Sequence, residues 1–127
     1  VGTVIPQSGS GLRYDGTYVQ RNGELAYYMR FFERGNVALV AGPEKADVPR
    51  TNSIRSYLTA DVPSGTNSVH NTPVTRAGDS LFFRTMAVNG AIDYRGKAYG
   101  DSVVFEKISR INGRRAVLTY RLLSDAQ

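Results

Sequence analysis

Apolar and polar residues alternate through most of this chain with a period of two, which is the period of a half-buried β-strand. Residues 91–98 show the pattern most cleanly, because Ile92 and Tyr94 fall on one face while Asp93 and Arg95 fall on the other. Similar runs recur along the chain, and glycine-containing turns separate them. The pattern therefore predicts an all-β domain of short antiparallel strands.

The alternating runs predict about eight strands, which share a high content of β-branched and aromatic residues. They cover residues 12–20, 26–33, 37–41, 69–76, 80–87, 91–98, 102–109 and 115–123. In the fourth run, Pro73 lacks a backbone donor and indicates an edge or an irregular strand. Short strands joined by tight turns favour a closed antiparallel up-and-down barrel, since closure removes exposed strand edges. A two-layer sandwich is the alternative architecture.

One turn motif occurs twice, because the sequence Gly-Asp-Ser at 78–80 is repeated at 100–102. Glycine accepts the positive φ that a tight turn requires, and aspartate tolerates it. We therefore interpret Asp79 and Asp101 as residues whose side chains satisfy the turn backbone, with a pair of catalytic acids as the alternative. Asn-Gly pairs at 22–23, 89–90 and 112–113 mark three further turns.

One long segment, 42–67, interrupts the rhythm between the third and fourth predicted strands. Within it, residues 51–60 carry apolar positions at helical spacing. They indicate either a short helix with Thr51 as its N-cap or a long loop. We expect the whole segment to act as a lid over the barrel.

Composition limits the domain count and the available chemistry. The chain has 127 residues, 41% of them hydrophobic, which suits one globular domain at 12–127 after a flexible Gly/Ser-rich lead-in at 1–11. It has no Cys, so disulfides and thiolate chemistry are excluded, and with a single His we expect no metal site. No apolar run approaches the ~18 residues of a membrane span.

The aromatic content, 8 Tyr and 5 Phe without Trp, directs attention to the barrel interior. Tyrosine rings with an accessible hydroxyl suit a small apolar ligand that has one polar end. The candidate ligand-binding tyrosines are Tyr14, Tyr18, Tyr28, Tyr94 and Tyr120. Plain core packing is the preferred interpretation, because side chains can fill an eight-stranded barrel. The side chains expected to fill it are Met29, Phe31, Leu39, Phe83 and Tyr94.

The net charge of +5 raises the question of anionic partners. The densest basic group, Lys107, Arg110, Arg114 and Arg115, surrounds a predicted hairpin. It is a candidate contact for an anionic polymer, a lipid headgroup or a protein partner. We prefer to interpret it as a solvated turn, and nucleic acid is not expected because Lys and Arg are dispersed along the chain.

The remaining titratable residues form no catalytic constellation. We interpret His70 as a surface histidine, with a proton donor or ligand at the barrel mouth as the alternative. Asp93 and Glu106 fall on neighbouring strands, and we expect them to be outward charges opposite Lys97 or Arg95 rather than facing acids. No phosphate loop, dinucleotide fingerprint or Ser-His-Asp grouping occurs. We therefore expect no enzymatic activity and no cofactor.

Three segments together carry a resemblance to a known class of barrel. They are Gly-Thr-Tyr at 16–18, the aromatic and arginine-containing hairpin at 28–37, and 96–101 with the strand and Asn-Gly turn that follow. In this combination the chain resembles the small lipocalin-like (calycin-type) β-barrels, which include compact bacterial domains of unknown function. Tyr18 stands where lipocalins carry Trp. The resemblance implies that a basic residue of a late strand, here Arg121, covers that ring by a cation–π contact and joins the candidate ligand-binding residues.

Two functional hypotheses follow. The first is a non-enzymatic barrel that binds a small, mostly apolar molecule inside it or at its mouth. The alternative is an interaction module that binds a protein or an anionic polymer through the basic hairpin. A chain without Cys is compatible with either the cytoplasm or an oxidising compartment, and we prefer a secreted or periplasmic location.

Overall fold

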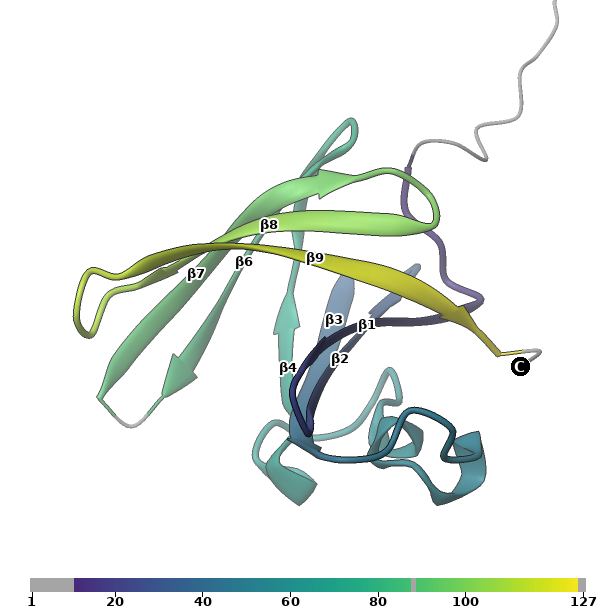
Figure 1. Cartoon of the computed structure of the whole chain (residues 1–127). Coiled ribbons are helices and arrows are strands. Elements are labelled where there is room, and N and C mark those ends of the chain that lie inside the picture. The colour runs from purple at the N-terminus through teal and green to yellow at the C-terminus, as the bar shows by residue number, and fades with distance from the viewer. Residues whose placement is uncertain (1–10, 88, 126–127) are drawn as a thin grey trace, which may run out of the picture.

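The computed structural model describes residues 11–87 and 89–125, and these form one antiparallel, nearly closed β-barrel (Figure 1). The described strands are β1 (Gly16–Asn22), β2 (Leu25–Phe32), β3 (Asn36–Pro43), β4 (His70–Pro73), β5 (Thr75–Ala77), β6 (Ser80–Ala87), β7 (Gly90–Ala98), β8 (Ser102–Ser109) and β9 (Arg115–Ser124). Their order in the sheet is β4-β3-β2-β1-β9-β8-β7-β6-β5. Strands consecutive in the chain are neighbours, except that β4 and β5 lie at opposite ends of the order, and β1 joins β9. The all-β, up-and-down barrel expected from the sequence is confirmed.

The first strand of the barrel begins later in the chain than the sequence pattern predicts. β1 begins at Gly16, whereas the first alternating run begins at residue 12. Most of the expected flexible lead-in, 1–10, lies outside the described residues. Gly11 forms an isolated bridge with Tyr99, and its carbonyl oxygen accepts a hydrogen bond from Gly100 N–H at 2.7 Å.

The fourth predicted strand is split into β4 and β5 at Val74, and this split nearly closes the barrel. β4 pairs with β3, whereas β5 pairs with β6 at the other end of the sheet. Pro73 is the last residue of β4, as expected of a residue that cannot donate to a ladder. The Val74 N–H donates to Gly35 O at 2.8 Å. Where β4 passes β6, Thr72 Oγ1 donates to Arg84 O at 3.0 Å.

Aromatic rings fill one end of the barrel interior. Phe105 lies stacked against Phe31 and edge-on to Phe83, with ring centroids 6.5 Å and 5.3 Å away. Tyr18 meets Phe31 edge-on at 5.9 Å. Each such pair adds about 0.5–1.5 kcal/mol to the burial of its rings. Gly96 makes this packing possible, because a Cβ at that position would lie 2.0 Å from the backbone oxygen of the neighbouring strand and 2.8 Å from the Phe105 ring.

The segment between β3 and β4 contains only 3-10 turns among its described residues. These turns are η1 (Arg50–Asn52), η2 (Ile54–Tyr57) and η3 (Thr66–Ser68). Ser53 rather than Thr51 caps η2, since its Oγ accepts a hydrogen bond from Arg55 N–H at 3.1 Å. Of the two alternatives for residues 51–60, the short helix is therefore wrong and the loop is confirmed.

This segment, which we call the outer segment (residues 44–69), packs against the outer faces of β2 and β3 (Figure 1). Tyr28 and Val40 point to that face, opposite to the barrel interior, and Leu58 and Val69 of the outer segment are buried against them. The expectation of a lid is therefore corrected. The apolar residues of the outer segment cover a second, external cluster because β2 and β3 are apolar on both faces.

Glu44 fastens the outer segment to the barrel. Its Oε1 accepts hydrogen bonds from the hydroxyls of Tyr28 and Ser53, both at 2.5 Å, and its Oε2 accepts one from Ile54 N–H at 2.9 Å. Burial raises the pKa of the Glu44 carboxyl, but these hydrogen bonds outweigh burial and the pKa is lowered overall. Glu44 thus holds the outer segment as a charged acceptor.

Candidate functional site

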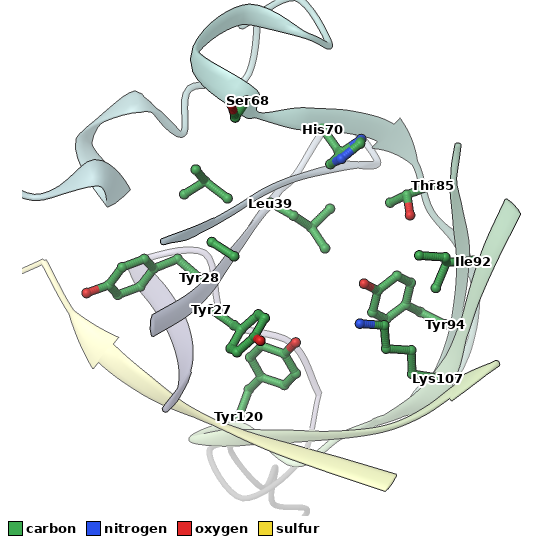
Figure 2. A pocket seen from close by; sticks show the side chains of 12 residues that line it. Tyr27, Tyr28, Leu39, Ser68, His70, Thr85, Ile92, Tyr94, Lys107 and Tyr120 are labelled. Atoms are coloured by element: carbon green, nitrogen blue, oxygen red, sulfur yellow. The ribbon is translucent and has the colours of Figure 1, made fainter. Parts of the chain in front are cut away.

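The other end of the barrel interior is open and forms a cavity of about 300 Å³ (Figure 2). The period of two explains why it is there. Residues two apart in a strand share a face, and Phe83 and Phe105 of the aromatic core are followed at that spacing by Thr85 and Lys107. Bulky rings are therefore replaced by smaller or polar side chains toward this end. The side chains that line the space include Tyr27, Leu39, Thr85, Ile92, Tyr94, Lys107 and Tyr120, with Ser68 and His70.

Two tyrosine hydroxyls in this cavity lack a protein partner. The Tyr94 and Tyr120 side chains belong to residues that are only 7% and 3% exposed. Neither hydroxyl has a hydrogen-bond partner within the part of the chain that the structure describes, and Figure 2 shows both pointing into the central space. Because both hydroxyls open into the cavity, each can bond to water or to a ligand there.

Both phenols have pKa values well above neutral pH, because the ordinary tyrosine value of about 10 is raised further by burial. The pKa of Tyr94 is raised to about 12, and that of Tyr120 is also raised. Near neutral pH both side chains therefore keep their protons and can donate a hydrogen bond. Tyr27, also in the wall, adds a third hydroxyl on the same side of the cavity as Tyr120 (Figure 2).

Lys107 is the cation of the cavity wall. Its Nζ lies 5.8 Å from the centroid of the Tyr94 ring, which is the geometry of a cation–π contact. No ion pair involves Lys107 among residues 11–87 and 89–125, and no Asp or Glu is part of the described lining. The cavity is therefore electropositive and rich in donors.

The candidate tyrosines separate into two groups. Tyr94 and Tyr120 line the cavity from β7 and β9. Tyr28 also borders it, but its hydroxyl is directed to Glu44 on the outside. Its neighbour Tyr27 faces the cavity instead, because it lies two residues before the core residue Met29 and so on the same face of β2. The period of two in the sequence already indicated this inward position.

The other two candidate tyrosines lie away from the cavity. Tyr18 is fully buried, donates from its hydroxyl to Gly100 O at 2.6 Å and accepts from Arg13 N–H at 3.0 Å. The Tyr14 hydroxyl accepts a hydrogen bond from Arg76 at 3.0 Å. Both residues therefore connect parts of the scaffold.

The cation–π contact expected between Arg121 and Tyr18 does not form. Arg121 stands opposite Val19 in the β1–β9 ladder and is exposed. Because Tyr120 faces the interior, the next residue must face outward. The Tyr18 ring instead packs against Phe31.

The basic hairpin residues do not form a single patch. Lys107 lines the cavity, Arg110 Nε pairs with Asp93 at 2.8 Å, and Arg115 pairs with Glu106 at 3.1 Å. Lys107 points into the barrel from β8 and so away from the arginines of the turn. Two of the three arginines form ion pairs with acidic neighbours. The hairpin therefore offers less free charge than its sequence indicated.

Asp93 and Glu106 are outward charges, but their partners differ from those expected. Asp93 is 1% exposed and pairs with Arg84 at 2.6 Å as well as with Arg110. Hydrogen bonds from Arg84 lead the effects that lower its pKa to about 2. Glu106 stands opposite Arg95 in the ladder, as expected. Lys97 is a partner of neither acid.

The repeated turn has the predicted backbone but not the predicted side-chain role. Gly78 and Gly100 have φ of +61° and +80°, which confirms the turn chemistry. The carboxylate of Asp101 accepts a hydrogen bond from Arg13 at 2.7 Å rather than one from its own turn. The repeat is therefore part of the scaffold.

His70 is exposed and borders the cavity, so its position is compatible with both interpretations made from the sequence. The described residues include no group of three or more His, Cys, Asp or Glu side chains that could hold a metal ion. They also include no helix long and apolar enough to cross a membrane. Comparisons with protein-family models, curated proteins and solved structures found no match to this chain.

Proposed function

We propose that this protein is a non-enzymatic, lipocalin-like barrel that binds a small, mostly apolar molecule in the cavity at its open end. The observation that carries the proposal is the interior cavity into which the Tyr94 and Tyr120 hydroxyls point without a hydrogen-bond partner among the described residues. Its volume of about 300 Å³ lies at the lower end of the range for ligand pockets. A few placed polar groups in an otherwise apolar wall are typical of such sites.

Core packing alone accounts for only part of the interior. Met29, Phe31 and Phe83 are buried in the closed end, as a filled barrel requires. Leu39 and Tyr94 are also buried, but each borders the cavity. A ligand would thus rest on an apolar floor and meet hydroxyls at its polar end.

The test is binding of 1-octanol, followed by backbone amide chemical shifts in NMR spectra. Wild-type protein should show saturable shifts at cavity residues. Ile92→Trp, which fills the space with an indole, should weaken binding at least about tenfold, the equivalent of 1.4 kcal/mol. Val117→Trp is the matched control, because Val117 is exposed on the outer surface. Shifts confined to the outer surface, or equal binding by Ile92→Trp, would contradict the proposal.

Native mass spectrometry of freshly purified protein supplies an independent test. A ligand that occupies the cavity should appear as a mass shift in wild-type protein and be absent from Ile92→Trp. A mass shift of equal occupancy in both proteins would place the bound molecule elsewhere.

A further inference from the structure

We infer that the ligand of this cavity carries an anionic head group, held by Lys107 together with the hydroxyls of Tyr94 and Tyr120. This inference rests on the proposed function, since it names the class of molecule that the same cavity takes. The class is an apolar molecule with one negatively charged group, of which a carboxylate is the simplest example.

The first argument is the charge of the cavity wall. Lys107 contributes an ammonium group that has an aromatic neighbour but no carboxylate partner among the described residues. No acidic side chain of residues 11–87 or 89–125 lines the space. A partly buried cation without a counter-ion lowers the energy of an anion brought beside it, and a cationic ligand would be repelled.

The second argument is the hydrogen-bond inventory. The Tyr94 and Tyr120 phenols are protonated near neutral pH, as tyrosine ordinarily is, and burial raises their pKa further, so each can donate to a ligand oxygen. Figure 2 shows these hydroxyls and the Lys107 ammonium pointing into the same space. A carboxylate accepts several hydrogen bonds, and a bond to an ionised acceptor is about twice as strong as a neutral one.

The third argument is size. A cavity of about 300 Å³ has room for a molecule of about ten non-hydrogen atoms, taking the ~30 Å³ that a water molecule occupies in the liquid. Leu39 and Ile92 provide apolar surface for the tail. Octanoate has this size, and 1-octanol is its neutral counterpart with nearly the same tail.

The experiment compares octanoate, 1-octanol and octylammonium at pH 7 by NMR titration of the intact chain. Octanoate should bind at least about tenfold more tightly than 1-octanol, and octylammonium should bind more weakly than both. Lys107→Met should weaken octanoate about tenfold while leaving 1-octanol within about twofold, because it removes the charge and keeps an apolar stem. Lys107→Arg should retain the preference for octanoate.

Lys97→Met is the matched control, because it removes the same charge from the outer face of β7 and should leave all three affinities unchanged. Equal binding of octanoate and 1-octanol in the wild-type cavity, or no effect of Lys107→Met on octanoate, would overturn the anionic head group while the proposed function stands. If none of the three probes shifts the cavity residues, both the proposed function and this inference fail.

Discussion

The position of a charged residue along its strand determines whether its side chain faces the outside of the barrel or the cavity. Asp93 and Lys107 come from adjacent strands, yet the carboxylate faces outward between two arginines while the ammonium faces inward, with no ionic partner in the part of the chain that the structure describes. The difference follows from the alternation of side chains along each strand. Asp93 is therefore a residue whose loss should affect stability rather than binding.

Asp93→Asn should lower the free energy of unfolding by about 1–3 kcal/mol at pH 7, because the arginines lose a buried, charged acceptor. The Asp93 pKa is depressed from 3.8 to about 2 in the folded protein. Its stabilisation is therefore complete above the unfolded pKa and is lost as pH falls through the folded one. Urea unfolding at pH 7 and at pH 2 measures both values, and the gap between variant and wild type should shrink at pH 2.

Asp79→Asn is the control for that experiment, since Asp79 is exposed in a turn. It should change stability by less than about 0.5 kcal/mol at either pH. A gap between Asp93→Asn and wild type that stays constant from pH 7 to pH 2 would contradict the role assigned to the carboxylate.

A glycine of β7 sets how closely two strands approach. Gly96→Ala would place a Cβ against the backbone oxygen of Val104 and the ring of Phe105. We expect a loss of at least about 2–3 kcal/mol in stability, because the backbone cannot shift without disturbing the aromatic core. Thermal unfolding followed by circular dichroism measures this loss. Lys97→Ala, one residue further on, should lie within about 0.5 kcal/mol of wild type. Equal stability of both variants would mean that the strands can separate freely here.

At the scale of elements, the sequence predicted strands far better than their surroundings. The alternation of apolar residues located all the strands except that it joined β4 and β5 in one run, which Pro73 marked as an edge or irregular strand. Both signals are local, which is why the sequence shows them. The alternation that turns Tyr27 inward also turns Tyr28 outward, so the apolar outer face of β2 was visible in the sequence. Which segment covers that face depends on contacts distant in sequence, and no local pattern shows them. Lys107 was grouped with nearby arginines, although its place two residues after the core residue Phe105 indicated that it faces inward.

The attachment of the outer segment gives an element-scale prediction. Glu44→Gln removes the negative charge that accepts three hydrogen bonds, so amide hydrogen exchange should accelerate in residues 50–68 while the strands of the barrel keep their protection. Affinity for 1-octanol should stay within about twofold of wild type, because Ser53 and Ile54, the residues of the outer segment that Glu44 holds, are not part of the cavity lining. Hydrogen-exchange mass spectrometry and the NMR titration give the two measurements.

Glu33→Gln serves as the control for Glu44→Gln, because Glu33 is exposed in the turn between β2 and β3. It should leave both exchange and affinity unchanged. A loss of 1-octanol binding in Glu44→Gln alone would restore the lid interpretation of the outer segment.

At the scale of the whole molecule, the barrel closes by a seam that is weaker than its other strand contacts. β4 and β6 are not paired in a ladder, and the bond from Thr72 Oγ1 to Arg84 O spans them. Thr85 of β6 and His70 of β4 both border the cavity, so the seam runs along one wall of the site. We therefore expect opening of this seam to be the motion that most directly exposes the cavity.

Thr72→Val keeps the shape of the side chain but removes the bond across the seam. We expect a loss of about 0.5–1.5 kcal/mol in stability and faster hydrogen exchange in β4, with the β1–β2 and β8–β9 ladders unchanged. If ligands pass through the seam, 1-octanol should also dissociate faster from the variant, which NMR line shapes measure. Thr119→Val, on the exposed face of β9, is the matched control. Faster exchange spread equally over all strands would show that the barrel opens as one unit, whereas exchange confined to β4 and the facing edge of β6 places the opening beside the cavity.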